Sequence, residues 1–313
     1  MLLLVQYTLT FASVLILVAL GGCISERSGV INLGLEGIMV MGAMGGALAM
    51  RYIPAGSPAI VIILGVLLAA ALVGVLYSCL LAVASINFKA DQIIIGTAMN
   101  MLATAGATVA VKAMNTAASG GNDVSSEIAY TQTKDLLLVR FGGFEFNWFM
   151  PVAILCLVVS YVVLYKSRFG LRLRACGEHP QAADSVGINV YKMRYAGVVI
   201  SGALGAIGGM AYIVPPVQTW NFEVGVAGAG FLAMAVMIFG QWKPFNIFGA
   251  AMFFAVFKSL ANIADSTFLA QLHWSSNIYN MMPFVASMII LAFTSKNSMA
   301  PKAEGIPYDK GSR

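Results

Sequence analysis

Hydrophobic runs long enough to cross a lipid bilayer recur along the whole chain, separated by short polar or Pro/Gly-rich connections. A bilayer core about 30 Å thick needs about 20 apolar residues in a helix. The runs lie at about 2–22, 34–50, 59–84, 93–113, 147–165, 196–214, 225–241, 244–262 and 279–295. The second and the seventh are short and rich in glycine. The pattern predicts an all-α polytopic membrane protein with about nine transmembrane helices, in one transmembrane domain over residues 1–313.

The composition supports a membrane protein. Hydrophobic residues make up 59% of the chain and charged residues only 10%, whereas a soluble domain carries about 25% charged residues. So few charges cannot cover the surface of a soluble protein of 313 residues. This argues against a soluble enzyme, a disordered protein and a nucleic-acid-binding module. The first basic residue is Arg27, so the segment before it lacks the basic start of a signal peptide, and we expect it to be retained as a span.

The basic residues predict the orientation, because Lys and Arg concentrate in cytoplasmic loops. The densest cluster lies between the fifth and sixth spans: Lys166, Arg168, Arg172, Arg174, Lys192 and Arg194. With this loop in the cytoplasm, 13 basic residues fall inside and 4 outside. We therefore expect an external N-terminus, a cytoplasmic loop at about 166–195, an external loop at about 114–146 that has room for a short surface helix, and a cytoplasmic tail at about 296–313.

The segment Glu26-Arg-Ser-Gly-Val-Ile-Asn-Leu-Gly-Leu-Glu-Gly37 separates the first two spans. Asn32 is a good N-cap, and Glu36 in the first turn suits the positive end of a helix. One interpretation is a helix cap at the cytoplasmic interface. The other is a broken helix, with Asn32 and Glu36 at membrane depth beside a polar pathway, where irregular backbone is tolerated.

A stripe of small and polar residues marks one face of the fourth span. Thr97, Asn100, Thr104 and Thr108 are spaced so that they share a helix face. Such a stripe indicates either close helix packing or a wet pathway. Packing is the better interpretation for the threonines, and both remain open for Asn100.

The basic loop contains more than a connector needs. Pro180 begins a helix-permissive run, and Gly187 ends it. This predicts a cytoplasmic helix of about two turns. Attraction to anionic lipid explains the charges but not the capped helix, so we favour a docking helix for a cytoplasmic partner.

Other features have less specific meanings. Gly202, Gly205, Gly208 and Gly209 are typical of close helix packing. Trp220 and Phe222 fit an aromatic interface belt, a gate or a stacking platform, and the role of Lys258 is open. The four cysteines and two histidines show no metal-ligand spacing. The chain has no Gly-Lys dipeptide, hence no phosphate-binding loop of the Walker type. We expect no cofactor, no metal and no catalytic residue.

Three of these segments together resemble the bacterial ABC-transporter permeases of the branched-chain amino acid, ribose and nucleoside class. They are residues 26–37, Ala90-Asp-Gln-Ile-Ile-Ile-Gly-Thr-Ala-Met-Asn100, and Gly170-Leu-Arg-Leu-Arg-Ala-Cys-Gly-Glu178 continuing to Asn189. The strongest resemblance is to the nucleoside-type permease that accompanies a basic-membrane-protein-type binding lipoprotein. It runs over nearly the whole chain, and it is more specific for the class than for the substrate.

The resemblance implies the partners. The family's Ala-Ala-x-x-x-Gly stretch is similar to the coupling helix of ABC permeases; Ala182, Ala183 and Gly187 match it, and Gln181 replaces the usual Glu. The coupling candidates are Arg172, Arg174, Glu178, Pro180, Ala182, Ala183 and Gly187. The implied assembly contains a cytoplasmic ABC ATPase that hydrolyses ATP, a second homologous permease subunit and an extracellular substrate-binding lipoprotein, in the bacterial plasma membrane and without nucleic acid.

Four functions remain to be weighed. The first is the permease subunit of an ATP-driven nucleoside importer, with Asn32, Glu36, Thr97, Asn100 and Trp220 as candidate pathway residues. The second is a permease for ribose-like sugars or branched-chain amino acids. The third is an ion-coupled secondary transporter, which would usually need acidic residues in several spans, whereas only Glu36 qualifies. The fourth is a membrane scaffold, which would not need a capped helix in its basic loop.

Overall fold

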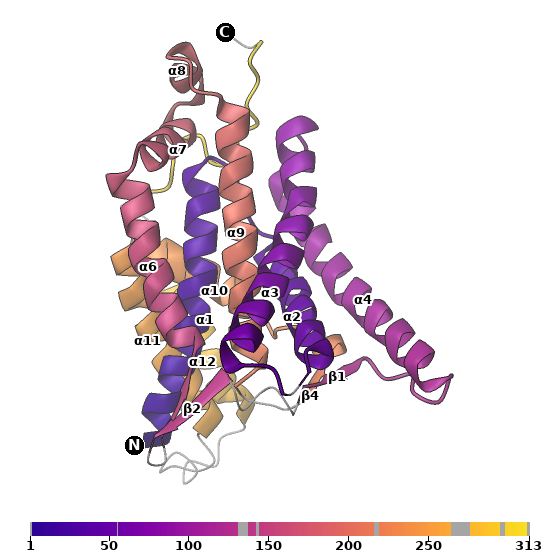
Figure 1. Cartoon of the computed structure of the whole chain (residues 1–313). Coiled ribbons are helices and arrows are strands. Elements are labelled where there is room, and N and C mark those ends of the chain that lie inside the picture. Colours follow the sequence, from indigo (N-terminus) through magenta and orange to yellow (C-terminus); the bar gives the residue numbers. More distant parts are fainter. Residues whose placement is uncertain are drawn as a thin grey trace.

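The protein is a helical bundle whose long helices run between two ends (Figure 1). The structure, a computed structural model, describes residues 2–54, 56–130, 137–141, 144–215, 219–263, 276–294 and 298–311. Its helices are α1 (Leu2–Arg27), α2 (Leu35–Tyr52), α3 (Ala59–Ala82), α4 (Gln92–Ser119), α6 (Phe149–Lys166), α7 (Arg168–Glu178), α8 (Pro180–Ser185), α9 (Val190–Ile213), α10 (Ala229–Phe239), α11 (Pro244–Ile263) and α12 (Ser276–Thr294). A π-helical turn, η1 (Val83–Asn87), follows α3, and a 3₁₀ turn, η2 (Phe222–Val224), precedes α10.

Helices α1 and α9 form the centre of the bundle. α1 packs against α9, α11, α6 and α10, while α9 also packs against α2 and α3 (Figure 1). α1 is buried on all sides from Ala12 onward, which explains why its sequence is apolar all round. Close packing depends on small residues: a Cβ on Gly209 would overlap the backbone of Met39 on α2. The packing role predicted for the α9 glycines therefore agrees with their positions.

Six helices of the described chain are long and apolar enough to cross a membrane: Leu3–Arg27, Ala59–Asn87, Gln92–Ser119, Phe149–Lys166, Val190–Ile213 and Pro244–Ile263. The other three predicted spans overlap α2, α10 and α12, so the count of nine stays a prediction. The predicted span 225–241 contains only the 11-residue helix α10. Such a helix is about 16 Å long, roughly half of a bilayer core. Residues 219–228, which precede α10, form a short strand, the η2 turn and further turns.

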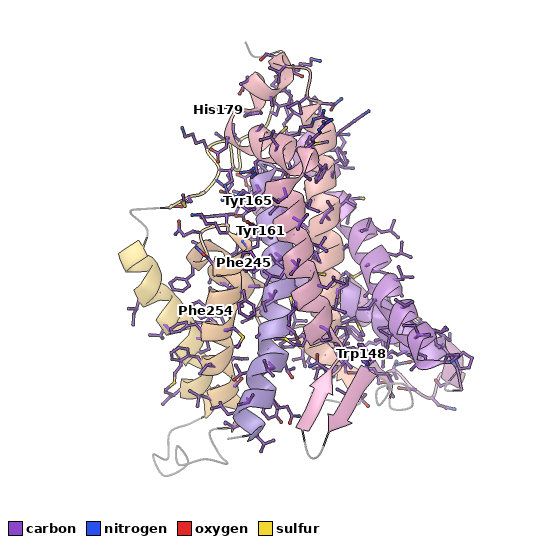
Figure 2. All side chains as sticks on the ribbon, turned by 60° about the vertical axis from the view of Figure 1, so that its left-hand side comes forward. Trp148, Tyr161, Tyr165, His179, Phe245 and Phe254 are labelled. Atoms are coloured by element: carbon purple, nitrogen blue, oxygen red, sulfur yellow. The ribbon has the colours of Figure 1, made fainter. Side chains whose placement is uncertain are left out.

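The two ends of the bundle differ in structure. One end, here called the strand end, carries the start of α1 and four short strands: β1 (Glu127–Ala129), β2 (Leu138–Phe141), β3 (Phe144–Asn147) and β4 (Thr219–Asn221). β1 pairs with β4, and β2 with β3, both antiparallel. The other, here called the basic end, carries α7, α8 and residues 298–311. Figure 2 shows His179 at the basic end and Trp148 at the strand end.

Two expectations about this architecture need correction. The strands make the protein mostly helical rather than all-α. The fourth span was expected to end near residue 113, but α4 continues to Ser119, where Gly120 at φ 64° ends it. Polar contacts extend the helix beyond its apolar run: Asn115 Nδ2 donates to the carbonyl oxygens of Ser125 and Glu127, both at 2.9 Å. α4 also leans away from the bundle at its strand end (Figure 1).

Candidate functional site

Residues 28–34 form a non-helical segment that enters the bundle between α1 and α2 and is largely buried. Irregular backbone inside a membrane protein must find its hydrogen-bond partners within the protein. The Ile31 amide donates to Gln92 Oε1 of α4 at 2.7 Å. Ser25 Oγ of α1 donates to the Val30 carbonyl at 2.8 Å. Side chains of the neighbouring helices therefore hold this segment, which we call the entry segment.

Asn100 of α4 fastens the end of the entry segment to the start of α2. Its Nδ2 donates to the Leu33 carbonyl at 3.0 Å. Its Oδ1 accepts the amide hydrogen of Gly37 at 2.8 Å. Gly37 allows this approach, because a Cβ there would lie 2.8 Å from the Met99 carbonyl oxygen. Two of the polar groups of Asn100 thus serve the backbone of residues 33–37.

Asn32 does not cap α2, and that prediction is wrong. The N-cap is Gly34, which makes no side-chain cap hydrogen bond. Asn32 is fully buried, and its Nδ2 donates to Ser201 Oγ of α9 at 2.9 Å. Its position two residues before the cap directs the amide to the neighbouring helix. Its Oδ1 has no hydrogen-bond partner, which leaves one free acceptor inside the bundle.

The Glu36 carboxylate binds the N-terminus of α10. Its Oε1 accepts from the Gly228 amide at 2.8 Å, and its Oε2 from the Gly230 amide at 2.6 Å. An anion at this position neutralises the positive end of the helix and satisfies amides that have no partner within it. Gly228 lines a small cavity together with Val14 and Leu15, halfway along α1. Glu36 therefore lies deep in the bundle rather than at its end, and the two short glycine-rich segments of the sequence meet there.

The remaining pathway candidates make their contacts elsewhere. Thr97 is exposed, and its hydroxyl donates to the carbonyls of its own helix, at 3.0 Å to Ile93 and 2.8 Å to Ile94. Trp220 lies on β4, with its ring centroid 5.8 Å from that of Tyr212 in an edge-to-face arrangement. Phe222 is fully buried, so its ring is not available to stack a ligand. The structure thus brings Asn32, Glu36 and Asn100 to the start of α2 and leaves Thr97 and Trp220 outside that group.

Helix α7 binds to the end of α1 and to α6. The Arg174 guanidinium lies over the ring of Tyr165, 4.7 Å from its centroid. Glu178 Oε1 lies 3.7 Å from Arg27 Nη1. Arg172 is exposed. Two of the candidate coupling residues in α7 therefore attach this helix to the bundle, and the third faces outward.

Helix α8 is the short helix predicted after Pro180, and it projects from the basic end (Figure 1). Pro180 and Ala183 face the protein, whereas Gln181 and Ala182 are exposed. Gly187 follows the helix at φ 84°, and no atom lies within 4 Å of where its Cβ would be. Ala183 of the Ala-Ala-x-x-x-Gly stretch thus anchors α8 together with Pro180, while Ala182 and Gly187 of the stretch are exposed.

The tail, residues 298–311, runs across the basic end, a feature that the sequence did not suggest. The Ala303 amide donates to the Gly177 carbonyl at 2.8 Å. Arg194 Nη1 of α9 donates to the Ile306 carbonyl at 2.9 Å. Asp309 pairs with Lys89 at 2.9 Å, and this hydrogen bond lowers the pKa of the Asp309 carboxyl. Because the tail is polar and short, hydropathy carries no signal for its position.

Sequence reasoning also missed the residues around Trp242, between α10 and α11. The Trp242 indole N–H donates to Glu26 Oε2 at 2.6 Å. Its carbonyl accepts from Arg27 Nε at 3.3 Å and Nη2 at 3.2 Å. A signal was present in the two charged residues that end the first apolar run, but their partner is more than 200 positions away. Among the residues that the structure describes, no group of three or more His, Cys, Asp or Glu side chains has the arrangement of a metal site.

Comparison with known proteins identifies the class. Residues 4–292 match the family described as the branched-chain amino acid transport system / permease component. The guanosine ABC transporter permease protein NupQ of Bacillus subtilis (strain 168) is 39% identical, over 99% of this chain and 97% of NupQ. The nucleoside ABC transporter permease protein NupC of Lactococcus lactis subsp. cremoris (strain MG1363) is 37% identical, over 96% of this chain and 95% of NupC. NupB, a nucleoside ABC transporter permease protein of the same strain, is 28% identical over 41% of this chain and 38% of NupB.

The bundle and these matches define a membrane-spanning permease subunit of an ABC transporter. The chain belongs to the branched-chain amino acid transport system / permease component family. It is a multi-pass integral protein of the plasma membrane, and it is a transport component rather than a catalyst.

Proposed function

We propose that this chain is the permease subunit of an ATP-driven importer for nucleosides. The observation that carries the proposal is the similarity over nearly the full length to two permeases named for guanosine and for nucleosides, at 39% and 37% identity. The resemblance seen in the sequence motifs leads to the same class.

The chemistry of the described residues is compatible with an uncharged ligand. A nucleoside needs hydrogen-bonding groups and a flat surface for its base. The edge-to-face pair of Trp220 and Tyr212 offers aromatic surface at the strand end, where stacking of a base contributes about 1–3 kcal/mol. An amino acid would need partners for both its ammonium and its carboxylate. Glu36 is already bound to two backbone amides, so it is a poor partner for an ammonium group.

The proposed assembly places the strand end outside the cell and the basic end in the cytoplasm. A separate ATPase would dock on the exposed residues of α8 and on Arg172, within the loop 166–195. A second, homologous permease subunit would complete the pathway; NupB and NupC, two permeases of one strain, are a parallel for such a pair. A binding lipoprotein would deliver the ligand at the strand end, near the loop 114–146.

Uptake measurements test the substrate. Cells with and without the gene are compared for uptake of labelled guanosine, uridine, ribose, glucose and leucine. We expect loss of the gene to reduce guanosine or uridine uptake and to leave the other three unchanged. Loss of ribose, glucose or leucine uptake with normal nucleoside uptake would overturn the nucleoside proposal and keep the permease class. Re-expression of the gene serves as the control for secondary effects of the deletion.

A further inference from the structure

Helix α10 is flanked at both ends by residues with left-handed backbone conformation. Ala227 at φ 50° and Gly228 at φ 78° precede it, and Gln241 at φ 54° and Trp242 at φ 52° follow it. Non-glycine residues seldom adopt this conformation. In the described part of the chain only Lys89 shares it with these three. The backbone therefore changes direction sharply on either side of a short, regular helix.

Each end of α10 is also fastened by a glutamate of a neighbouring helix. At the N-terminal end, Glu36 of α2 accepts the amides of Gly228 and Gly230, at 2.8 and 2.6 Å. At the C-terminal end, Glu26 of α1 accepts the indole N–H of Trp242 at 2.6 Å. These are short hydrogen bonds to buried or half-buried carboxyl groups, and breaking one would leave polar groups without a partner inside the bundle, so both connections resist separation.

The C-terminal connection continues to α7. Arg27 donates from Nη2 to the Trp242 carbonyl at 3.2 Å, and its Nη1 lies 3.7 Å from Glu178 Oε1 of α7. A Cβ on Gly177 would overlap the backbone of Arg27, so α7 and the end of α1 are in direct contact. A continuous set of contacts therefore runs from α7 through Arg27 and Trp242 to α10, and from α10 to Glu36.

We propose that α10 is a rigid link that transmits a displacement of α7 to the start of α2 in the middle of the bundle, with Glu36 and Trp242 as its positioning residues. The inference rests on the proposed function, in which an ATPase acts on α7 and α8. A helix of 11 residues is stiff over its length, and the sharp turns on both sides separate it from the neighbouring chain segments. The entry segment and Asn100 then receive this movement at the start of α2.

The alternative is that Glu36 only caps α10 and Trp242 only packs. Loss of a cap or of a packing contact lowers stability and the amount of assembled complex. Loss of a link lowers the coupling between ATP hydrolysis and transport in a complex that still assembles. The ratio of substrate transported to ATP hydrolysed therefore separates the two.

The test uses the complete transporter, purified with its ATPase, partner permease and binding protein and reconstituted in proteoliposomes. The variants are Glu36→Gln, Trp242→Phe and the double variant. Gln keeps the size and shape of Glu, and Phe keeps an aromatic ring at position 242 while it removes the indole N–H. Glu223→Gln is the matched control, because Glu223 pairs with Lys112 at 2.6 Å on the exposed strand end. The assay uses the substrate that the wild-type transporter carries, chosen from the five compounds of the uptake experiment. A wrong substrate assignment therefore does not affect this test.

We expect each single variant to lower transport per ATP about tenfold, because each removes one short hydrogen bond of the link, with ATP hydrolysis within about twofold of wild type. The double variant should be no worse than the more affected single variant, because both break one link. Normal coupling in either single variant would overturn the proposal, as would losses that multiply in the double variant. Glu223→Gln should transport normally.

A further variant, Gly230→Ala, tests the same contact if the Glu36→Gln transporter does not assemble. A Cβ at position 230 would lie 2.6 Å from the Glu36 amide nitrogen and 2.7 Å from its Cα. Gly230→Ala therefore separates the same two helices from the α10 side. We expect the same loss of transport per ATP with retained hydrolysis. Normal coupling in assembled Gly230→Ala would overturn the proposal independently.

Discussion

Asn100 holds the entry segment, and its replacement by alanine tests whether holding is its role. Asn100→Ala removes the hydrogen bond to the Leu33 carbonyl, 3.0 Å, and the one from the Gly37 amide, 2.8 Å. Hydrogen bonds between membrane helices contribute about 0.6 kcal/mol on average and at most about 1.7 kcal/mol. The two together are therefore worth about 1–3 kcal/mol. Backbone groups left without a partner move the value toward the upper end of this range.

Asn100→Asp sharpens the test, because an ionised carboxylate can accept from Gly37 but cannot donate to Leu33. Thr97→Ala is a matched control on the same helix, since the Thr97 hydroxyl bonds only to α4 itself. We expect the free energy of unfolding to change by less than about 0.5 kcal/mol in this control, because alanine also favours helix. We expect Asn100→Asp to lower the free energy of unfolding by at least half as much as Asn100→Ala does.

The assay is equilibrium unfolding of the purified permease in mixed detergent micelles, followed by its tryptophan fluorescence. A loss of 1–3 kcal/mol corresponds to a shift of about 5- to 150-fold in the unfolding equilibrium. If Asn100→Ala unfolds like the wild type and yet abolishes uptake in cells, Asn100 acts on the ligand and not on the entry segment. If Asn100→Ala changes neither the free energy of unfolding nor uptake, the two observed hydrogen bonds are energetically unimportant and the reasoning is wrong.

Three further predictions follow from local geometry. Gly187→Val should reduce stimulation of the ATPase, because a β-branched residue resists φ 84°, whereas Gly187→Asn should retain it. Equal stimulation by the two variants would show that the ATPase does not dock at this site. Gly209→Ala should lower the free energy of unfolding by about 1–3 kcal/mol, because its Cβ would overlap Met39 of α2. Gly106→Ala should be neutral or stabilising, because no atom lies within 4 Å of where its Cβ would be. Burial raises the pKa of the Cys176 thiol to about 11 from 9.0, so at pH 7.5 its thiolate is about a hundredfold scarcer than in the unfolded chain. Maleimide should therefore modify Cys176 slowly in the folded permease and quickly in SDS, and equal rates would contradict the burial.

Local signals predicted the parts of the structure that local interactions determine. Pro180 and Gly187 correctly bounded α8, because proline suits the first turn of a helix and the positive φ of Gly187 ends it. Apolar length located the long helices. It failed at the end of α4, because Asn115 and its partners extend the helix beyond the apolar run. Hydropathy reports the solvent around a helix and not where the helix stops.

The site was only partly predictable, because its polar residues have partners that are distant in the sequence. Glu36 and Asn100 stood out as polar residues in apolar surroundings, and both hold backbone groups in the structure, while their role in a substrate pathway stays a prediction. Their partners were not visible: Glu36 binds amides 192 and 194 positions away. Asn32 was misread because a cap can be inferred from neighbouring residues, whereas its bond to Ser201 crosses 169 positions. Trp242 gave no signal, since its role depends entirely on Glu26 and Arg27.

The environment of Glu36 also bears on how transport is powered. An ion-coupled transporter needs an acidic group that can exchange a proton or a cation during the cycle. Both carboxylate oxygens of Glu36 accept backbone amides at the positive end of α10, so the protein's own backbone already occupies this group. Lys258, on α11, also lines the cavity at the start of α10, and no described carboxylate pairs with it. Because this deep carboxylate serves the backbone, it is a poor candidate for the ion-exchanging group that a secondary transporter needs.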